Sequence, residues 1–172
     1  MTAVRIRMAR PSDAEAFYEI LSGPTVVWGT LQLPHQTPEA WRKRLEGNDG
    51  QFDYALVAEV DGKVVGSASI HRKRHPRTLH VAGLGMAVHE AYHGQGIGRA
   101  LMAALVEAAD KWLNIVRIEL EVWPDNERAV KLYESFGFVT EGRKRMIAFR
   151  DGQYVDALVM ARIRPDMEPQ GG

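Results

Sequence analysis

The chain has 172 residues, of which 45% are hydrophobic and 26% charged, and this length and composition fit one soluble globular domain. Its 22 Lys and Arg residues balance its 22 Asp and Glu residues, so no net field favours nucleic acid or an anionic membrane, and the absence of cysteine excludes disulfides and a cysteine nucleophile. The N-terminus lacks the apolar run of a signal peptide and no 18-residue apolar stretch occurs, so we expect a cytoplasmic protein with no membrane span.

The first half of the chain predicts strands and helices in alternation. Residues 4–8 alternate apolar and polar side chains as a strand does, and Ser12 and Glu15 have the spacing of a capping box that opens a helix to about residue 21. Residues 23–36 are expected to form a loop, and Thr37-Pro38 begins a second helix. The strands 52–60 and 63–71 that follow flank the hairpin dipeptide Asp61-Gly62, and a third strand is expected over residues 80–88.

The second half predicts a long amphipathic helix from about Gly98, with apolar residues at helical spacing. A strand, a helix and a final hairpin around Asp151-Gly152 follow, with the expected boundaries 116–123, 124–136, 138–139, 146–150 and 154–163. The order indicates an α+β fold with one mixed sheet flanked by helices. We expect a single domain over residues 1–165 and a frayed tail over 166–172.

The segment 88–101, VHEAYHGQGIGRAL, has two incompatible interpretations. His89 and His93 fit H-E-x-x-H, which binds zinc when both histidines lie on one helix. The segment before His89 reads as a strand, however, and the glycines after His93 would end a helix at once. The alternative is a phosphate-binding turn, in which Gly94, Gly96 and Gly98 let backbone N–H groups converge at a helix N-terminus. The same glycines would also suit a tight strand-to-helix turn with no ligand.

The segment 119–138, ELEVWPDNERAVKLYESFGF, decides in favour of phosphate. Together with the glycine turn it resembles the GNAT superfamily of N-acetyltransferases, whose sequences carry R/Q-x-x-G-x-G/A and then N-x-x-A-x-x-L-Y-x-x-x-G-F. The second motif is matched throughout, by Asn126, Ala129, Leu132, Tyr133, Gly137 and Phe138. The first departs only at His93, which stands where Arg or Gln is usual.

The resemblance covers essentially the whole chain and implies a mostly antiparallel sheet of six to seven strands flanked by about four helices. More narrowly, residues 29–35 and the ending R-x-G-x-Y-V-D-A-x-x-M-A-R are similar to bacterial L-amino-acid N-acetyltransferases. An acetyl group would pass from acetyl-CoA, with no metal, to the α-amino group of a small acceptor such as phenylalanine or methionine. Acetylation of a phosphinothricin-type toxin or of a protein N-terminus, and a non-catalytic acyl-CoA sensor, are the alternatives. A homodimer is an expectation by analogy alone.

The same resemblance assigns the cofactor residues. The backbone of Met86, Ala87 and Val88 would pair with the pantetheine arm, and the turn would take the pyrophosphate. Asn126 is both a helix N-cap candidate and a cofactor contact, with Ala129 one turn on. The residues implied for the turn are His93, Gly94, Gln95, Gly96, Ile97, Gly98 and Arg99.

Two roles are expected in catalysis. Tyr133 matches the tyrosine that hydrogen-bonds the departing CoA thiolate. The amine needs a base, because an α-amino group is mostly protonated at pH 7. Glu121 stands twelve residues before Tyr133, the spacing of the catalytic glutamate in related ribosomal-protein N-acetyltransferases. His80 and a water relay are the other candidates.

The acceptor pocket is expected beside the loop between the first two helices, where Trp28, Leu31, Leu33 and Trp41 supply apolar surface. Core packing explains the same residues equally well. The basic run 71–77, HRKRHPR, has the charge to hold a carboxylate or the 3′-phosphate of the cofactor. We interpret it as a solvated connection, the commoner role of a charge run.

Overall fold

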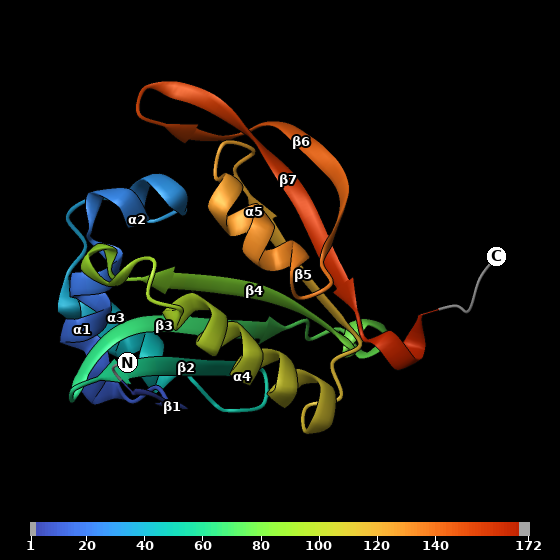
Figure 1. The fold of residues 1–172 in the computed structure, drawn as a ribbon, viewed down its shortest axis with the longest axis horizontal. Helices are drawn as coiled ribbons and strands as arrows, with labels where there is room; N and C mark the ends of the chain where they lie inside the picture. Colours follow the sequence, from blue (N-terminus) through green and yellow to red (C-terminus); the bar gives the residue numbers. More distant parts are fainter. Residues whose placement is uncertain (1–2, 169–172) are drawn as a thin grey trace.

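The computed structural model describes residues 3–168, which form one twisted sheet with helices on both faces (Figure 1). The strands are β1 (Val4–Met8), β2 (Asp53–Val60), β3 (Lys63–Arg72), β4 (Val81–Val88), β5 (Arg117–Val122), β6 (Val139–Arg150) and β7 (Gln153–Ile163). The helices are α1 (Ala14–Leu21), α2 (Pro24–Gly29), α3 (Pro38–Glu46), α4 (Ile97–Lys111) and α5 (Glu127–Glu134). Short 3-10 turns occur at Pro11–Asp13 (η1), Pro76–Thr78 (η2), Glu90–Tyr92 (η3) and Pro165–Met167 (η4).

The seven strands lie in the order β1-β2-β3-β4-β5-β7-β6, and every neighbouring pair is antiparallel except β4 and β5. The parallel pairing of β4 and β5 extends only from Val81 opposite Arg117 to Gly83 opposite Glu119. Beyond that point the two strands diverge, as Figure 1 shows. The sheet is therefore continuous at one end of β4 and β5 and open at the other.

The alternating strand residues fill two cores, one on each face of the sheet. Helix α4 packs across β1 to β4 on one face, where Leu101, Met102 and Leu105 are fully buried. On the other face α1 packs on β3 and α3 packs on α1, around Phe17 and Trp41. The sheet is therefore covered by α4 on one face and by α1 and α3 on the other.

The predicted α+β fold with a mixed sheet is confirmed, and the sheet has seven strands. Two details differ. Residues 23–36 are not all loop, because Pro24 occupies the first turn of α2, a position where its missing N–H costs nothing, and Val26 is buried. The helices therefore number five within residues 3–168, and not about four.

The final hairpin also differs from its prediction. Strand β6 runs without a break from Val139 to Arg150, where two short pieces were expected. Its register shifts twice, and Met146, with a positive φ of 52°, lies within the second shift, between Lys144 and Ala148. Most of β6 is exposed, so it lacks the alternation of buried and exposed residues that reveals a strand in a sequence.

Among residues 3–168 no helix has the length and apolar character needed to cross a bilayer. The 3-10 turn at Pro165–Met167 ends the described chain, and the remainder of the predicted tail, residues 169–172, lies outside the described residues.

Candidate active site

A cavity of about 1320 Å³ lies where β4 and β5 diverge. One part is bordered by β4, the turn after it, and α5; the other part is bordered by α1, α2 and α3. The side chains that face the cavity from β2 and β3 are Asp53, Ala55, Ser67, Ser69 and His71. Two compartments therefore meet at the end of β4, as expected of a site that joins two substrates.

The glycine turn has the backbone that its sequence predicts. Gly94 and Gly96 have φ angles of 77° and 79°, which L side chains rarely adopt, and a Cβ built on either would meet no atom within 4 Å. Gly96 is the N-cap of α4, so the first free N–H groups of this helix point to the turn. Gly98 has another role, because a Cβ there would lie 3.5 Å from Leu132 of α5 and 3.7 Å from Met86 of β4. It allows α4, α5 and β4 to pack closely behind the turn.

His89 and His93 do not share a helix. His89 precedes the 3-10 turn Glu90–Tyr92, and its Nδ1 accepts a hydrogen bond from the Ala91 N–H at 3.2 Å. His93 follows the turn, and its Nε2 lies 2.7 Å from the carbonyl oxygen of Val88. Both rings therefore hold the backbone of the turn, and the helical placement that the zinc interpretation requires is absent from this segment.

The last residues of β4 have one free edge. Met86 and Ala87 pair with Ala68 and Ser67 of β3, whereas β5 has already separated on the other side. The backbone of this edge therefore faces the cavity.

The remaining turn residues are held in several ways. The Arg99 guanidinium donates to Ser135 Oγ at 3.1 Å, Gln95 donates to the Ala91 carbonyl, and the Ile97 side chain is buried in the core.

Helix α5 presents Asn126 and Tyr133 to the cavity. The Asn126 Oδ1 accepts from the Ala129 N–H at 3.3 Å, so the predicted N-cap is confirmed. Tyr133 is 8% exposed and packs on Phe138, with ring centroids 5.8 Å apart. Burial raises the pKa of Tyr133 to about 12. No hydrogen bond from its hydroxyl occurs within residues 3–168, so the phenol is a protonated donor without an internal acceptor.

The two strand glutamates share one face of β5, alternating with the buried Ile118, Leu120 and Val122. Glu121 lines the cavity, and its carboxylate forms an ion pair with the Lys144 ammonium of β6. The Glu119 carboxylate pairs with Lys73 Nζ at 2.7 Å and with Arg117 Nε at 3.1 Å. The hydrogen bond from Lys73 is the largest reason why the pKa of Glu119 is lowered. Both carboxylates thus have cationic partners.

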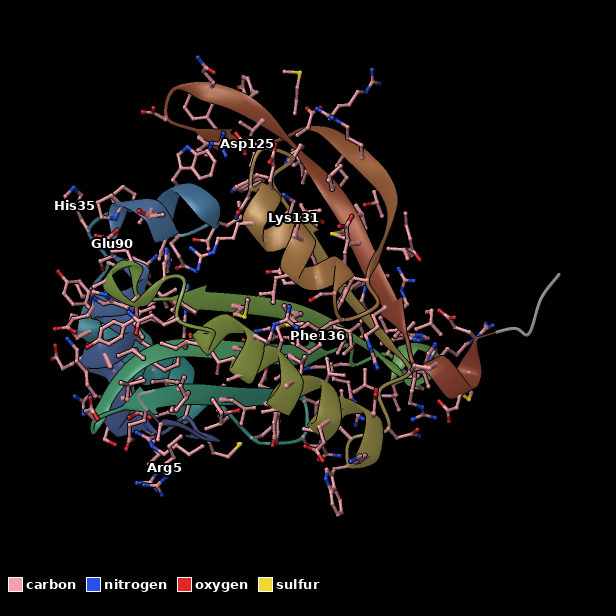
Figure 2. The ribbon with its side chains drawn as sticks, viewed as in Figure 1. Arg5, His35, Glu90, Asp125, Lys131 and Phe136 are labelled. Atoms are coloured by element: carbon pink, nitrogen blue, oxygen red, sulfur yellow. The ribbon has the colours of Figure 1, made fainter. Side chains whose placement is uncertain are left out.

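The predicted acceptor residues separate in the structure. Trp28 and Leu31 line the cavity, whereas Leu33 is 71% exposed and lies outside the lining. Trp41 belongs to the core beside Phe17 and also reaches the cavity wall. Trp28 lies on α2, opposite the end of α5 near which Figure 2 labels Asp125.

The basic run 71–77 is largely exposed, as the interpretation of a solvated connection requires, and it also makes specific contacts. Lys73 pairs with Glu119, and Arg74 pairs with Asp53 at 3.1 Å while lying 4.5 Å above the Phe52 ring. Arg72 donates to the Leu113 carbonyl. These contacts tie the connection between β3 and β4 to β2, to β5 and to the end of α4.

A model of the acetyltransferase (GNAT) family matches residues 14–138. The chain belongs to this family. An L-amino acid N-acetyltransferase, AaaT of Escherichia coli, is 41% identical over 95% of this chain and 100% of its own length. A phosphinothricin N-acetyltransferase of Alcaligenes faecalis is 31% identical over 93% of this chain and 82% of its own. The structure of yncA from Salmonella typhimurium with acetyl-CoA has a TM-score of 0.85 at 20% identity over 99% of this chain and 98% of that one, and shares the fold.

GNAT acetyltransferases use acetyl-CoA, and this acetyltransferase has features that fit it. The turn around Gly94 and Gly96 leaves room that a Cβ would occupy, at a helix N-terminus that favours anions. The free edge of β4 offers backbone hydrogen bonds to an extended arm. The chemistry of the turn and the shape of the opening thus both suit a pyrophosphate with a long amide-containing tail.

The sequence interpretation missed two groups of polar residues in this acetyltransferase. On α3, Lys43 and Arg44 line the cavity, and neither pairs with a carboxylate in the described part of the chain. On β2 and β3, Asp53, His71 and Ser69 form a hydrogen-bonded chain. Their signal in the sequence was weak, because Asp53 and His71 are 18 residues apart and only the hairpin register makes them neighbours.

Proposed function

We propose that this acetyltransferase acetylates the α-amino group of a free L-amino acid. The observation that carries the proposal is the pair of cations Lys43 and Arg44 on the part of the cavity wall that α3 supplies, beside the apolar lining residues Trp41 and Leu45. A free amino acid brings one carboxylate, which needs such a cation when it leaves water. The 41% identical relative that is an L-amino acid N-acetyltransferase supports the same acceptor.

An apolar side chain on the acceptor is the second part of the proposal. Phe17, Leu21, Val26 and Trp41 contribute apolar surface to the compartment bounded by α1, α2 and α3. Trp28 and Leu31 extend this surface toward α5. Phenylalanine and methionine would bury their side chains here at a gain of about 1.5–3 kcal/mol each.

The proposed path of acetyl-CoA follows the free edge of β4. Its pantetheine arm would pair with the backbone of Met86, Ala87 and Val88, and its pyrophosphate would lie on the N–H groups of the turn from His93 to Arg99. The His93 ring already bonds the Val88 carbonyl, which favours a structural role for that side chain. Asn126 and Ala129 would border the arm from α5.

In the proposed reaction the neutral amine attacks the thioester directly, since the chain has no cysteine to carry the acetyl group. Tyr133 would donate a hydrogen bond to the departing sulfur. A phenol with a pKa of about 12 holds its proton more firmly than a thiol with a pKa near 8.5, so full transfer costs about 5 kcal/mol. Tyr133 therefore acts as a fixed donor that stabilises developing charge.

Glu121 remains a proposal as the base that accepts the proton of the amine. Its position on the cavity wall supports the role, and its ion pair with Lys144 argues against it, because Lys144 occupies one of the carboxylate oxygens that would accept the proton. Glu121 would have to leave Lys144 before it accepts a proton.

Two alternatives share the site. A phosphinothricin-type acceptor carries the same α-amino acid group, and the 31% identical phosphinothricin N-acetyltransferase favours testing it. A catalytically idle acyl-CoA sensor would bind acetyl-CoA with no thiol release. Self-association is a separate proposal, supported by the exposed apolar side chains of the last hairpin, Met146, Ile147, Phe149 and Tyr154.

The deciding experiment is thiol release from acetyl-CoA with each of the twenty amino acids and phosphinothricin, for wild type and Tyr133→Phe. We expect turnover with a few apolar amino acids and a lower kcat in the variant. Turnover with phosphinothricin alone would identify a phosphinothricin-type toxin as the acceptor. A rise in melting temperature with acetyl-CoA but no turnover would favour the sensor.

A further inference from the structure

Three side chains on β2 and β3 form a hydrogen-bonded chain on the wall of the cavity. The Nδ1 of His71 lies 2.7 Å from Asp53 Oδ1, and its Nε2 lies 3.1 Å from Ser69 Oγ. Arg74 holds the other oxygen of Asp53 at 3.1 Å. Asp53 therefore fixes the tautomer in which Nδ1 carries the proton and Nε2 is free to accept one.

The serine end of this chain faces the strand along which acetyl-CoA is proposed to lie. Ser69 pairs with Gly85 of β4, one residue before Met86, and His71 pairs with Gly83. Neither Gly83 nor Gly85 has a positive φ, so the backbone conformation does not require glycine at these positions. A Cβ on Gly85 would lie 3.9 Å from Ser69 Oγ. The two glycines thus leave the surface in front of Ser69 and His71 open to the cavity.

We propose that His71, positioned by Asp53 and reached through Ser69, is the group that accepts the proton of the acceptor amine. The inference rests on the proposed acetylation of an amine and supplies its base. His71 is preferred to Glu121 because its Nε2 has no cationic partner, whereas the Glu121 carboxylate is bound to Lys144. Histidine is also the side chain that most often serves as a general base, and the hydrogen bond to Asp53 leaves its Nε2 as the acceptor.

The proton balance is complete. The ammonium group of the acceptor gives one proton to Ser69 Oγ as the hydroxyl proton of Ser69 moves to His71 Nε2, and Asp53 stabilises the imidazolium. The neutral amine forms the C–N bond and the C–S bond breaks. The second proton of the nitrogen reaches the thiolate, whose charge Tyr133 stabilises. His71 is 61% exposed at its side chain, so it returns its proton to water after each turnover.

The test is the pH dependence of kcat for His71→Gln, Ser69→Ala and the double variant, with an amino acid that wild type acetylates. At pH 7 we expect a loss of about 10²-fold in each, because general base catalysis contributes 10² or more. The loss should shrink toward pH 9.5, where the amine is neutral without help. The double variant should lose no more than either single variant, since one relay is broken in all three.

Asp53→Asn tests the positioning role and should lower kcat while leaving the KM for acetyl-CoA unchanged. The charged groups nearest the relay are Asp53 and Arg74, which it contacts, and the ion pair of Lys73 and Glu119 beyond Gly83 of β4. Lys43, Arg44 and Glu121 line the same cavity, and His71→Gln and Ser69→Ala leave all these charges in place. His75→Gln is the matched control, because His75 lies in the connection after β3 and, among residues 3–168, its ring bonds only the Arg77 N–H. Binding of acetyl-CoA, followed by melting temperature, checks that each variant is folded.

The outcomes separate this inference from the proposed function. A wild type that acetylates no amine overturns both. An active wild type with an unchanged pH profile in His71→Gln overturns the assignment of the base alone. A pH-dependent loss in Glu121→Gln that is absent from His71→Gln transfers the role to Glu121. A loss in His71→Gln that stays constant with pH identifies a structural role and also overturns the assignment.

Discussion

The Arg150 guanidinium lies 4.0 Å above the centre of the Trp28 ring, at the point where the last hairpin meets α2. Both oxygens of Asp125, just before α5, accept hydrogen bonds from the same guanidinium at 3.2 and 2.7 Å. One cation therefore joins three segments that border the cavity. A cation over an indole contributes about 0.5–2 kcal/mol, and the bidentate pair orients it.

Replacing Arg150 with Ala should loosen α2 and raise the KM for the acceptor by about tenfold, because 1.4 kcal/mol corresponds to a factor of ten. The KM for acetyl-CoA should change little, since the turn after β4 is untouched. Steady-state kinetics with each substrate varied in turn gives both values. Arg145→Ala on the same strand is the control, and an equal effect from it would contradict the role of Arg150.

Gly96→Ala should weaken acetyl-CoA binding. An L residue held at φ 79° costs about 1–2 kcal/mol, and the relaxation that removes the strain would move the N–H groups of the turn. Gly152 of the last hairpin has nearly the same φ, 76°, and is the matched control. Calorimetry should show a weaker Kd for acetyl-CoA in Gly96→Ala only, while both variants lose similar stability. Equal affinities would show that the turn does not hold the cofactor.

The proposed cofactor side of the cavity was more predictable from the sequence than the proposed acceptor side. The glycine turn and the N-cap of α5 depend on backbone constraints within a few residues, which local patterns record. Glu121 was placed on the correct face by strand alternation, but its pairing with Lys144 depends on β6, which lies two strands away across β7.

The acceptor side depends on contacts between distant segments. The hairpin register brings Asp53 to His71, and no local pattern distinguishes that histidine from the rest of the basic run. Helix α2 was missed because six residues with one buried side chain carry no helical period, and packing stabilises it. Leu33 was expected in the pocket on its apolar character alone, and an exposed leucine is common at protein surfaces.

Tyr133 should keep its proton throughout the pH range of an assay. Burial raises its pKa to about 12, so the phenol remains a donor up to about pH 11, whereas an ordinary tyrosine would begin to lose its proton near pH 9. We expect no alkaline fall in kcat from this residue below pH 10.5. A fall in wild type that Tyr133→Phe lacks would show that the phenol ionises earlier.

Asp13 should make the free energy of unfolding depend on pH in the acidic range. Burial alone would raise the pKa of Asp13, but hydrogen bonds from Arg7 and from the Arg10 N–H outweigh it and leave the pKa below its ordinary value. A carboxyl whose pKa is lowered by folding adds stability above its unfolded pKa, near 3.9, and that stability is lost as pH falls through the folded pKa. The free energy of unfolding of wild type, measured by urea denaturation, should therefore fall below about pH 4. In Asp13→Asn the dependence should be smaller, and an unchanged slope would argue against this contribution.

The ion pair of Arg162 and Asp110 should be costly to break from one side. Arg162 on β7 is 7% exposed, and two hydrogen bonds of 2.8 Å join it to Asp110 on α4, with a third to the Phe136 carbonyl. Asp110→Ala leaves a buried guanidinium without its counter-charge, which should cost about 3–5 kcal/mol of unfolding free energy. Asp110→Leu combined with Arg162→Met removes both charges and should cost much less. The exposed pair of Lys111 and Glu107 is the control, because Glu107→Ala should change stability by less than about 0.5 kcal/mol. If the double variant were as unstable as Asp110→Ala, the loss would come from packing and not from the unpaired charge.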